Sequence, residues 1–321
     1  MGRHKKGLDI NGWLIVDKPR NTGSTDVVNL ARRLFKAKKC GHCGTLDPFA
    51  TGVLPIAFGE ATKLIPFVTD GEKEYEFVVQ WGEATDTADT EGNVRETSDK
   101  IPSREEIEAV IPSFVGEIEQ VPPAYSAIKI NGRRAYDLVR KGEAVEMPAR
   151  RIHIYDLKFL EEIAGGKARF RVRCSKGTYV RTLGQDLALA LGTVGHLCEL
   201  RRVRCGIFGL DDKISLESLK NIVYFEDLQK FLLPLETLLR DIAVIAVSEA
   251  DALKLKMGQS LSPRTFDTES LRGKTAAATC DGSLIAIVRI DERRIAPVRV
   301  FNINDKENSD VDYERTETRS N

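Results

Sequence analysis

The segment GHCGTLDPFATGVLP, residues 41–55, is the part of the sequence from which the fold is best predicted. Its glycines and prolines are too closely spaced for a regular helix or strand, and they indicate an ordered loop. The apolar run 53–58 is typical of a buried strand. Asp47 stands before Pro48 in this loop, near His42, and could project into a cleft. The alternative is that Asp47 only forms the turn.

Regular elements are predicted on both sides of this loop. Before it, residues 13–16 form a short strand and a helix begins near Ser24, whose side chain could cap it. After it, residues 74–81 show the alternation of a half-buried strand. Helices are predicted at 105–115 and 180–191 from apolar residues at helical spacing. Arg181 then lies in the first turn of a helix, where a cation is disfavoured unless it has a negative partner.

Two further strands precede that helix. Residues 152–159 predict a strand with an irregularity near Tyr155. In the strand 167–174, one face is apolar and the other carries Lys167, Arg169, Arg171 and Arg173. Four like charges on one face repel each other unless an anion or cross-strand acids neutralise them. An RNA-binding surface and a salt-bridged sheet both meet this condition, and both interpretations stay open.

The C-terminal part of the chain predicts a small β domain. Short strands are expected at 276–279, 284–290 and 298–301, with Asp281-Gly282 as a hairpin turn. This domain covers about 243–301. The polar segment 302–321 is expected to be a disordered tail.

Charge is distributed unevenly along the 321 residues. The chain has 48 Lys plus Arg and 48 Asp plus Glu, so its formal net charge is zero. Neutrality at first argues against a nucleic-acid partner. However, residues 1–40 carry a net charge of +7, residues 70–119 carry −11 and residues 129–181 carry +8. Such blocks are a hint of nucleic-acid contact on one face, although clustered solvated surface would look the same.

The composition also restricts where the protein acts. No apolar run approaches the roughly 18 residues that a membrane-spanning helix needs. The apolar stretch 13–16 is too short for a signal sequence. The six cysteines are therefore expected to be reduced thiols, and the protein is predicted to be cytoplasmic.

Cofactor and metal motifs are missing from the sequence. It contains no G-x-G-x-x-G, H-E-x-x-H, G-x-S-x-G or phosphate loop. Cys40 and Cys43 have the spacing of a zinc pair, but Cys198 and Cys205 are too far apart for a matching second pair. No cofactor and no metal are predicted.

Five separated motifs, in chain order, resemble the bacterial TruB-type pseudouridine synthase family: DKP (17–19), the loop 41–55, EYE (74–76), CSKGTYVR (174–181) and LRR (200–202). The match extends from Asp9 to about Phe301. The family's usual Gly-His-Thr-Gly is Gly-His-Cys-Gly here. The Cys43 thiol is a weaker hydrogen-bond donor than the hydroxyl it replaces.

This resemblance implies an α+β fold with a mixed, largely antiparallel central sheet and flanking helices. The catalytic domain would cover 8–240, with an RNA-clasping insertion at about 122–151, and 243–301 would be a PUA-like RNA-binding domain. The implied reaction is isomerisation of uridine 55 in the TΨC loop of tRNA to pseudouridine, by base flipping. The partner would be the T arm of tRNA. No obligate protein partner is implied, and the protein is expected to be a monomer.

The resemblance also implies roles for particular residues. Asp47 would be the catalytic carboxylate, Arg181 would pair with it, and Tyr75 would stack on the uracil. His42 would occupy the space of the flipped bases. Tyr179 and Leu200 would line the uracil pocket, with Lys18 at its edge. From the residues alone, the two tyrosines and Leu200 could equally be core residues. Phosphate contacts would come from basic residues of the insertion: Lys129, Arg133, Arg134, Arg140 and Lys141.

Two other functions stay open. The chain could bind or fold tRNA through the same cleft without catalysis. It could also be a hydrolase in which Asp47 acts through water, which predicts free uracil as the product.

Overall fold

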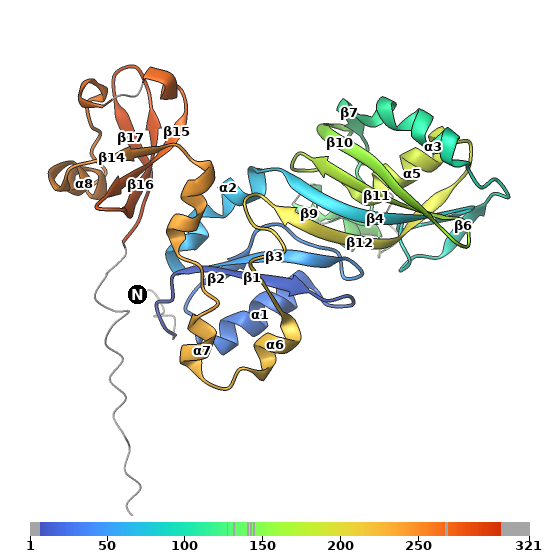
Figure 1. Ribbon diagram of the computed structural model, residues 1–321, viewed down its shortest axis with the longest axis horizontal. Coiled ribbons are helices and arrows are strands. Elements are labelled where there is room, and N and C mark those ends of the chain that lie inside the picture. Colours follow the sequence, from blue (N-terminus) through green and yellow to red (C-terminus); the bar gives the residue numbers. More distant parts are fainter. Residues whose placement is uncertain are drawn as a thin grey trace, which may run out of the picture. The chain divides into compact units, whose positions relative to one another are not determined.

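The computed structural model describes residues 7–126, 128–130, 132–139, 141, 143, 145–266 and 269–302. The chain divides into two compact units, Met1–Leu233 and Pro234–Asn321 (Figure 1). The division falls before the 3-10 helix Leu235–Asp241, whereas the sequence analysis placed it after residue 240. In that helix Leu235 and Leu238 are buried, and the Glu236 carboxylate accepts a hydrogen bond from the backbone N–H of Leu284 at 3.3 Å.

A mixed sheet forms the centre of the first unit. Among the described residues it has nine strands in the order β13-β1-β3-β12-β4-β11-β10-β7, with β2 also paired to β3. Only β1 with β13 and β3 with β12 pair in parallel there, so the predicted mixed, largely antiparallel sheet is confirmed. The strands are β1 Gly12–Lys18, β2 Cys40–His42, β3 Thr51–Phe58, β4 Lys73–Trp81, β7 Gly116–Gln120, β10 Arg150–Ile163, β11 Lys167–Cys174, β12 Gly195–Cys205 and β13 Lys213–Ser215.

Helices flank this sheet (Figure 1). They are α1 Ser24–Leu34, α2 Ile65–Asp70, α3 Arg104–Val110, α4 Ala135–Val139, α5 Val180–Ala190, α6 Leu216–Asn221 and α7 Phe225–Gln229, with 3-10 helices at Gly59–Leu64 and Ile111–Phe114. Two small hairpins complete the unit, β5 Glu83–Thr85 with β6 Val94–Thr97, and β8 Lys129–Ile130 with β9 Arg133–Arg134. Helix α5 packs against β12 and β4, and this places its first turn beside the sheet centre.

The basic face of strand β11 is salt-bridged through its three arginines. Arg171 pairs with Glu76 of the neighbouring strand β4, and Arg173 Nη1 lies 2.8 Å from Glu72 Oε2. Arg169 Nε lies 2.9 Å from Glu161 Oε1 on β10. Part of the acidic block 70–119 therefore neutralises this strand. The opposite, apolar face is core, where the Phe77 and Phe170 rings stack with centroids 5.3 Å apart.

Two local predictions were tested in this unit. The irregularity near Tyr155 is confirmed, because the β10–β11 register shifts between Ile154 and Asp156. The capping role of Ser24 was wrong, since α1 begins at Ser24 itself after Gly23. The Ser24 hydroxyl instead bonds both backbone groups of Leu46, at 2.9 Å each.

The second unit is a small sheet with one longer helix. Strands β14 Val244–Ala246, β15 Thr275–Cys280, β16 Ser283–Ile290 and β17 Ile295–Val300 lie in sequence order, and α8 Glu249–Lys256 packs on β15, β16 and β17. Short 3-10 turns cover Pro263–Thr265 and Glu269–Leu271. The predicted hairpin at Asp281-Gly282 is confirmed, with φ values of 49° and 81° that suit a tight two-residue turn. Over the described part of the chain, no helix is both long and apolar enough to cross a membrane.

Candidate active site

A cavity of about 370 Å³ opens where the loop 44–47 meets β4, β12 and the turn that leads into α5. Asp47, Tyr75, Tyr179, Arg181 and Leu200 all line it. These five residues come from four segments of the sequence, since Tyr179 and Arg181 are neighbours. The fold therefore brings together most of the residues for which the resemblance implies a role in the uracil pocket.

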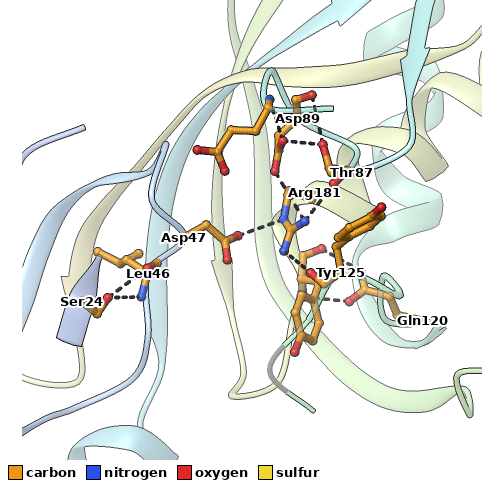
Figure 2. A network of polar contacts seen from close by, with 10 residues as sticks. Ser24, Leu46, Asp47, Thr87, Asp89, Gln120, Tyr125 and Arg181 are labelled. Atoms are coloured by element: carbon orange, nitrogen blue, oxygen red, sulfur yellow. Dashed lines mark hydrogen bonds and ion pairs between the residues drawn. The ribbon is translucent and has the colours of Figure 1, made fainter. Parts of the chain in front are cut away.

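The side chains of Ser24 and Lys18 anchor the loop that carries Asp47. The Ser24 hydroxyl holds Leu46, as described above (Figure 2). Lys18 is fully buried, and its ammonium donates to the carbonyl oxygens of Pro19, Thr22 and Pro48 at 3.0, 2.8 and 3.1 Å. Lys18 is not among the residues that line the cavity, so its visible task is to support the loop rather than to form the pocket edge. Burial lowers the pKa of Lys18 to about 8, and the nearby Asp47 carboxylate opposes this shift.

Arg181 is the centre of the polar network (Figure 2). Its side chain is 4% exposed, and its Nε lies 2.9 Å from Asp47 Oδ2. Its two terminal nitrogens donate to the carbonyl oxygens of Thr87, at 2.8 Å, and Tyr125, at 3.0 Å. An arginine held by three separate segments cannot change rotamer without breaking several bonds, so the guanidinium is fixed in position beside the carboxylate.

Asp89 is a second acid at Arg181, and the sequence analysis missed it. Its Oδ2 lies 3.5 Å from Arg181 Nη1, whereas Asp47 approaches Nε of the same guanidinium (Figure 2). Its Oδ1 accepts hydrogen bonds from the Thr87 hydroxyl at 2.6 Å and from the backbone N–H of Glu91 at 2.9 Å. The sequence showed only a polar turn at 83–93, and nothing in that pattern links the turn to residue 181.

The electrostatics of Asp47 follow from this arrangement. Burial in the cleft raises the pKa of the Asp47 carboxyl, the Arg181 guanidinium lowers it, and the Asp89 carboxylate raises it again. The net direction is upward from the ordinary value. Arg181 thus acts against a desolvation that would otherwise favour the protonated acid.

Tyr75 lies beside Arg202, a buried arginine for which the sequence analysis predicted no role in the site. Arg202 is 1% exposed, donates from Nε to the Val53 carbonyl at 2.8 Å and from Nη2 to the Gly44 carbonyl at 3.1 Å, and lines the cavity. Burial raises the pKa of Tyr75 to about 12, while Arg202 opposes this shift. The phenol therefore stays protonated at neutral pH. The strands approach so closely here that a Cβ on Gly52, where φ is +105°, would meet the Arg202 carbonyl oxygen at 2.1 Å.

Residues at the two ends of the insertion contact Tyr179. The Gln120 side chain accepts a hydrogen bond from the backbone N–H of Tyr179 at 2.8 Å and donates to its carbonyl at 3.1 Å. The guanidinium of Arg150 lies 5.8 Å from the ring centroid of Tyr179. Gln120 and Arg150 are paired residues at the ends of β7 and β10. The insertion between these strands is therefore attached directly to the cavity wall.

Neither His42 nor Cys43 is among the residues that line the cavity. His42 is half-buried, its Nδ1 has no hydrogen-bond partner among the described residues, and burial, followed by Arg202, lowers its pKa. Cys43 is fully buried, and the Cys205 thiol donates to its carbonyl oxygen at 3.3 Å. Burial raises the pKa of Cys43, whereas zinc requires thiolate ligands. The described residues contain no cluster of three or more His, Cys, Asp or Glu side chains that could hold a metal ion.

The basic residues of the insertion are only partly visible. Arg133 is exposed and pairs with Glu143 at 2.8 Å, and Lys141 is exposed. Lys129 and Arg134 belong to the β8–β9 hairpin, but their side chains lie outside what the structure describes. Arg140 lies outside the described residues. Neither Arg133 nor Lys141 is among the described residues that line the cavity.

Comparison with known proteins identifies the family. Residues 32–180 match the family described as "TruB family pseudouridylate synthase (N terminal domain)". Residues 181–240 match "tRNA pseudouridylate synthase B C-terminal domain", and residues 243–302 match "tRNA Pseudouridine synthase II, C terminal". The chain belongs to the TruB pseudouridine synthase family.

Individual relatives agree with the assignment to the TruB family. The chain is 45% identical over 309 residues to "tRNA pseudouridine synthase B" of Caulobacter vibrioides, covering 94% of this chain and 100% of the relative. It is 48% identical over 308 residues to the protein of the same name from Rhodospirillum rubrum, with the same coverage. Among solved structures, a chain of a Cbf5-Nop10-Gar1 complex has a TM-score of 0.69 and 26% identity, covering 91% of this chain and 84% of that chain. The predicted pseudouridine synthase fold is confirmed.

Proposed function

We propose that the protein is a tRNA pseudouridine synthase that converts uridine 55 in the TΨC loop to pseudouridine. The observation that carries the proposal is the Asp47–Arg181 ion pair, 2.9 Å long, at the wall of a cavity large enough for one nucleoside. Relatives named tRNA pseudouridine synthase B, aligned over nearly their whole length, support tRNA as the substrate.

The reaction moves one bond and one proton. The N1–C1′ glycosidic bond breaks, C5 of the turned uracil joins C1′, and the proton of C5 is lost while N1 gains one. The product is therefore an isomer, and no second substrate is consumed. The target base must leave the folded loop first, at a cost of a few kcal/mol. The chain's part is to hold the extruded nucleoside against an ionised, oriented Asp47, whether that carboxylate attacks carbon or transfers a proton.

The residues around Asp47 take supporting roles in this proposal. Arg181 keeps the carboxylate ionised and pointed into the cavity, against the desolvation that raises its pKa. Tyr75 offers a protonated aromatic ring on which uracil can stack, and Tyr179 and Leu200 close the pocket around it. His42, at the end of β2, would contact the bases displaced with the target uridine. Lys18 acts by holding the Asp47 loop.

The remaining parts of the proposal concern the RNA. The T arm is the part of tRNA that we expect to be bound, and the basic residues of the insertion would contact its phosphates without reading sequence. We also propose that the protein acts as a monomer in the cytoplasm.

The test compares Asp47→Asn with wild type for pseudouridine formation in a tRNA transcript, and separately for tRNA affinity. Asparagine keeps the shape of the side chain, so we expect binding to persist while pseudouridine is no longer formed. Asp212→Asn, an exposed site away from the cavity, is the matched control. Pseudouridine formation by Asp47→Asn would refute the catalytic assignment. A wild-type protein that binds tRNA but makes no pseudouridine would be a folding factor, and free uracil as product would indicate a hydrolase.

A further inference from the structure

Ser126 carries a buried hydroxyl at the wall of the cavity. Its side chain lines the cavity that Asp47 and Arg181 also line, and the residue is 4% exposed. The Ser126 Oγ atom has no hydrogen-bond partner among the described residues. Most buried polar atoms in native proteins are partnered, and leaving one open has a cost in stability. An open hydroxyl at the wall of a cavity suggests that something in the cavity completes it.

The backbone around Ser126 is fixed to the catalytic centre. The Tyr125 carbonyl oxygen accepts from Arg181 Nη2 at 3.0 Å, so the residue before Ser126 is tied to the arginine that holds Asp47 (Figure 2). The Ser126 carbonyl oxygen accepts from the backbone N–H of Tyr136 in α4 at 3.1 Å. Ser126 is therefore held between the insertion and the Asp47–Arg181 pair.

The Tyr179 hydroxyl is the polar neighbour of Ser126 on this wall. Burial raises the pKa of Tyr179, and the Ser126 hydroxyl is near enough to oppose that shift. The two groups do not meet hydrogen-bond geometry. Together they present a polar edge on a wall whose other members include the apolar Val180 and Leu200.

The isomerisation places an unusual demand on such an edge. Turning uracil about the axis through N3 and C6 exchanges N1 with C5, and it also exchanges O2 with O4. A donor that faces the carbonyl edge of the base therefore meets an oxygen both before and after the turn. A serine hydroxyl can rotate about its C–O bond to follow a moving acceptor, whereas a backbone N–H cannot.

We propose that the Ser126 hydroxyl donates a hydrogen bond to the uracil carbonyl that faces it, O2 or O4, on both sides of the base turn. The proposal rests on the proposed pseudouridine synthase function. It makes Ser126 a substrate-contacting residue of this reaction, supplied from the start of the insertion.

The first test measures rate and stability together in Ser126→Ala. We expect single-turnover pseudouridine formation to slow by about tenfold, the effect of losing one hydrogen bond in the complex. We expect the Tm of the free protein to stay the same or to rise, because the Ser126 Oγ atom has no hydrogen-bond partner to lose among the described residues. The thiol of Ser126→Cys is a weaker donor of similar size, so the rate of this variant should lie between those of the wild type and Ser126→Ala.

Ser103→Ala is the matched control with the opposite signature. Ser103 is the N-cap of α3, with a capping box to Glu106, and lies outside the cavity. Its loss should lower the Tm and leave the rate unchanged. A Ser126→Ala protein whose Tm falls as in this control would show a structural role and overturn the proposal.

The second test changes the base instead of the protein. A T-arm RNA with 4-thiouridine or 2-thiouridine at the target offers sulfur, a weaker acceptor than oxygen. Each substitution should slow the wild type more than it slows Ser126→Ala. Equal slowing in both proteins, or a wild-type rate for Ser126→Ala on uridine, would overturn the contact. Absence of pseudouridine with wild type and uridine would instead refute the proposed function itself.

Discussion

Replacing Asp89 by asparagine is expected to extend activity to lower pH. Asp89 and Asp47 both lie at the Arg181 guanidinium, and the negative charge of Asp89 contributes to raising the pKa of Asp47. Asparagine has the same shape, and its oxygen can still accept from the Thr87 hydroxyl and the Glu91 N–H. The substitution therefore removes mainly one charge.

The size of the shift follows from the geometry. The 2.9 Å and 3.5 Å contacts place both carboxylates at one guanidinium, at different nitrogens. Two unit charges roughly 8 Å apart interact by about 2 kcal/mol at an effective dielectric constant of about 20. Removing the charge of Asp89 therefore lowers the pKa of Asp47. Asp47 acts as the carboxylate, so activity is lost as the pH falls through its raised pKa. Lowering that pKa moves the acid limb to lower pH, and solvent screening reduces the size of the change.

The assay is single-turnover pseudouridine formation on a T-arm RNA, measured across the acid and neutral range. Asp86→Asn is the matched control, because Asp86 lies in the same turn but pairs with Arg95 at 2.9 Å and does not touch Arg181. Its acid limb should match the wild type. The neutral plateau of Asp89→Asn should fall, since Arg181 loses a charged partner. An acid limb that stays in place, or moves to higher pH, would refute the proposed sharing of Arg181.

Two further predictions concern the insertion and its roots. Gln120→Leu should lower the free energy of unfolding by about 1 to 3 kcal/mol, because the Tyr179 N–H loses its partner while the Tyr179 carbonyl keeps the Leu183 N–H at 3.0 Å. Denaturant titration beside Gln229→Leu, at an exposed site, would check this, and equal stabilities would contradict it. Arg133→Gln should reduce the salt dependence of tRNA affinity by about one in log–log slope if Arg133 meets a phosphate. Glu143→Gln, which removes the partner of Arg133 at 2.8 Å, should strengthen binding; a weaker complex would count against the phosphate contact.

The sequence predicted the Asp47 loop and its supporting sheet well, because those features depend on local patterns. Alternation marks β4, and the crowded glycines and prolines mark the loop. Arg181 in the first turn of a helix signalled a missing negative partner, and Asp47 lies 2.9 Å from it. The roles of these residues in catalysis came from the family resemblance, and they stay predictions until the Asp47 variant is measured.

The residues that the sequence did not reveal act through contacts distant in the chain. Asp89 meets Arg181 across a turn that appeared only polar, and Gln120 holds the backbone of Tyr179. Arg202 binds the carbonyls of Gly44 and Val53. In each case a side chain meets a partner whose nearness depends on strand order and register. Residue composition carries no information about either.

The pairing of the charges also depends on strand register, which the sequence does not reveal. The acids of β4 lie opposite the arginines of β11 only in the observed register, with Arg171 beside Glu76. Part of the negative charge of the block 70–119 is thus paired with arginines within the sheet. Among the described residues that line the cavity, Asp47 is the one acid, against the bases Lys73, Arg150, Lys176, Arg181 and Arg202. A chain with zero net charge therefore presents a positive site to RNA. This excess of positive charge opposes the desolvation that raises the pKa of Asp47, and it would also attract the phosphates that flank an extruded uridine.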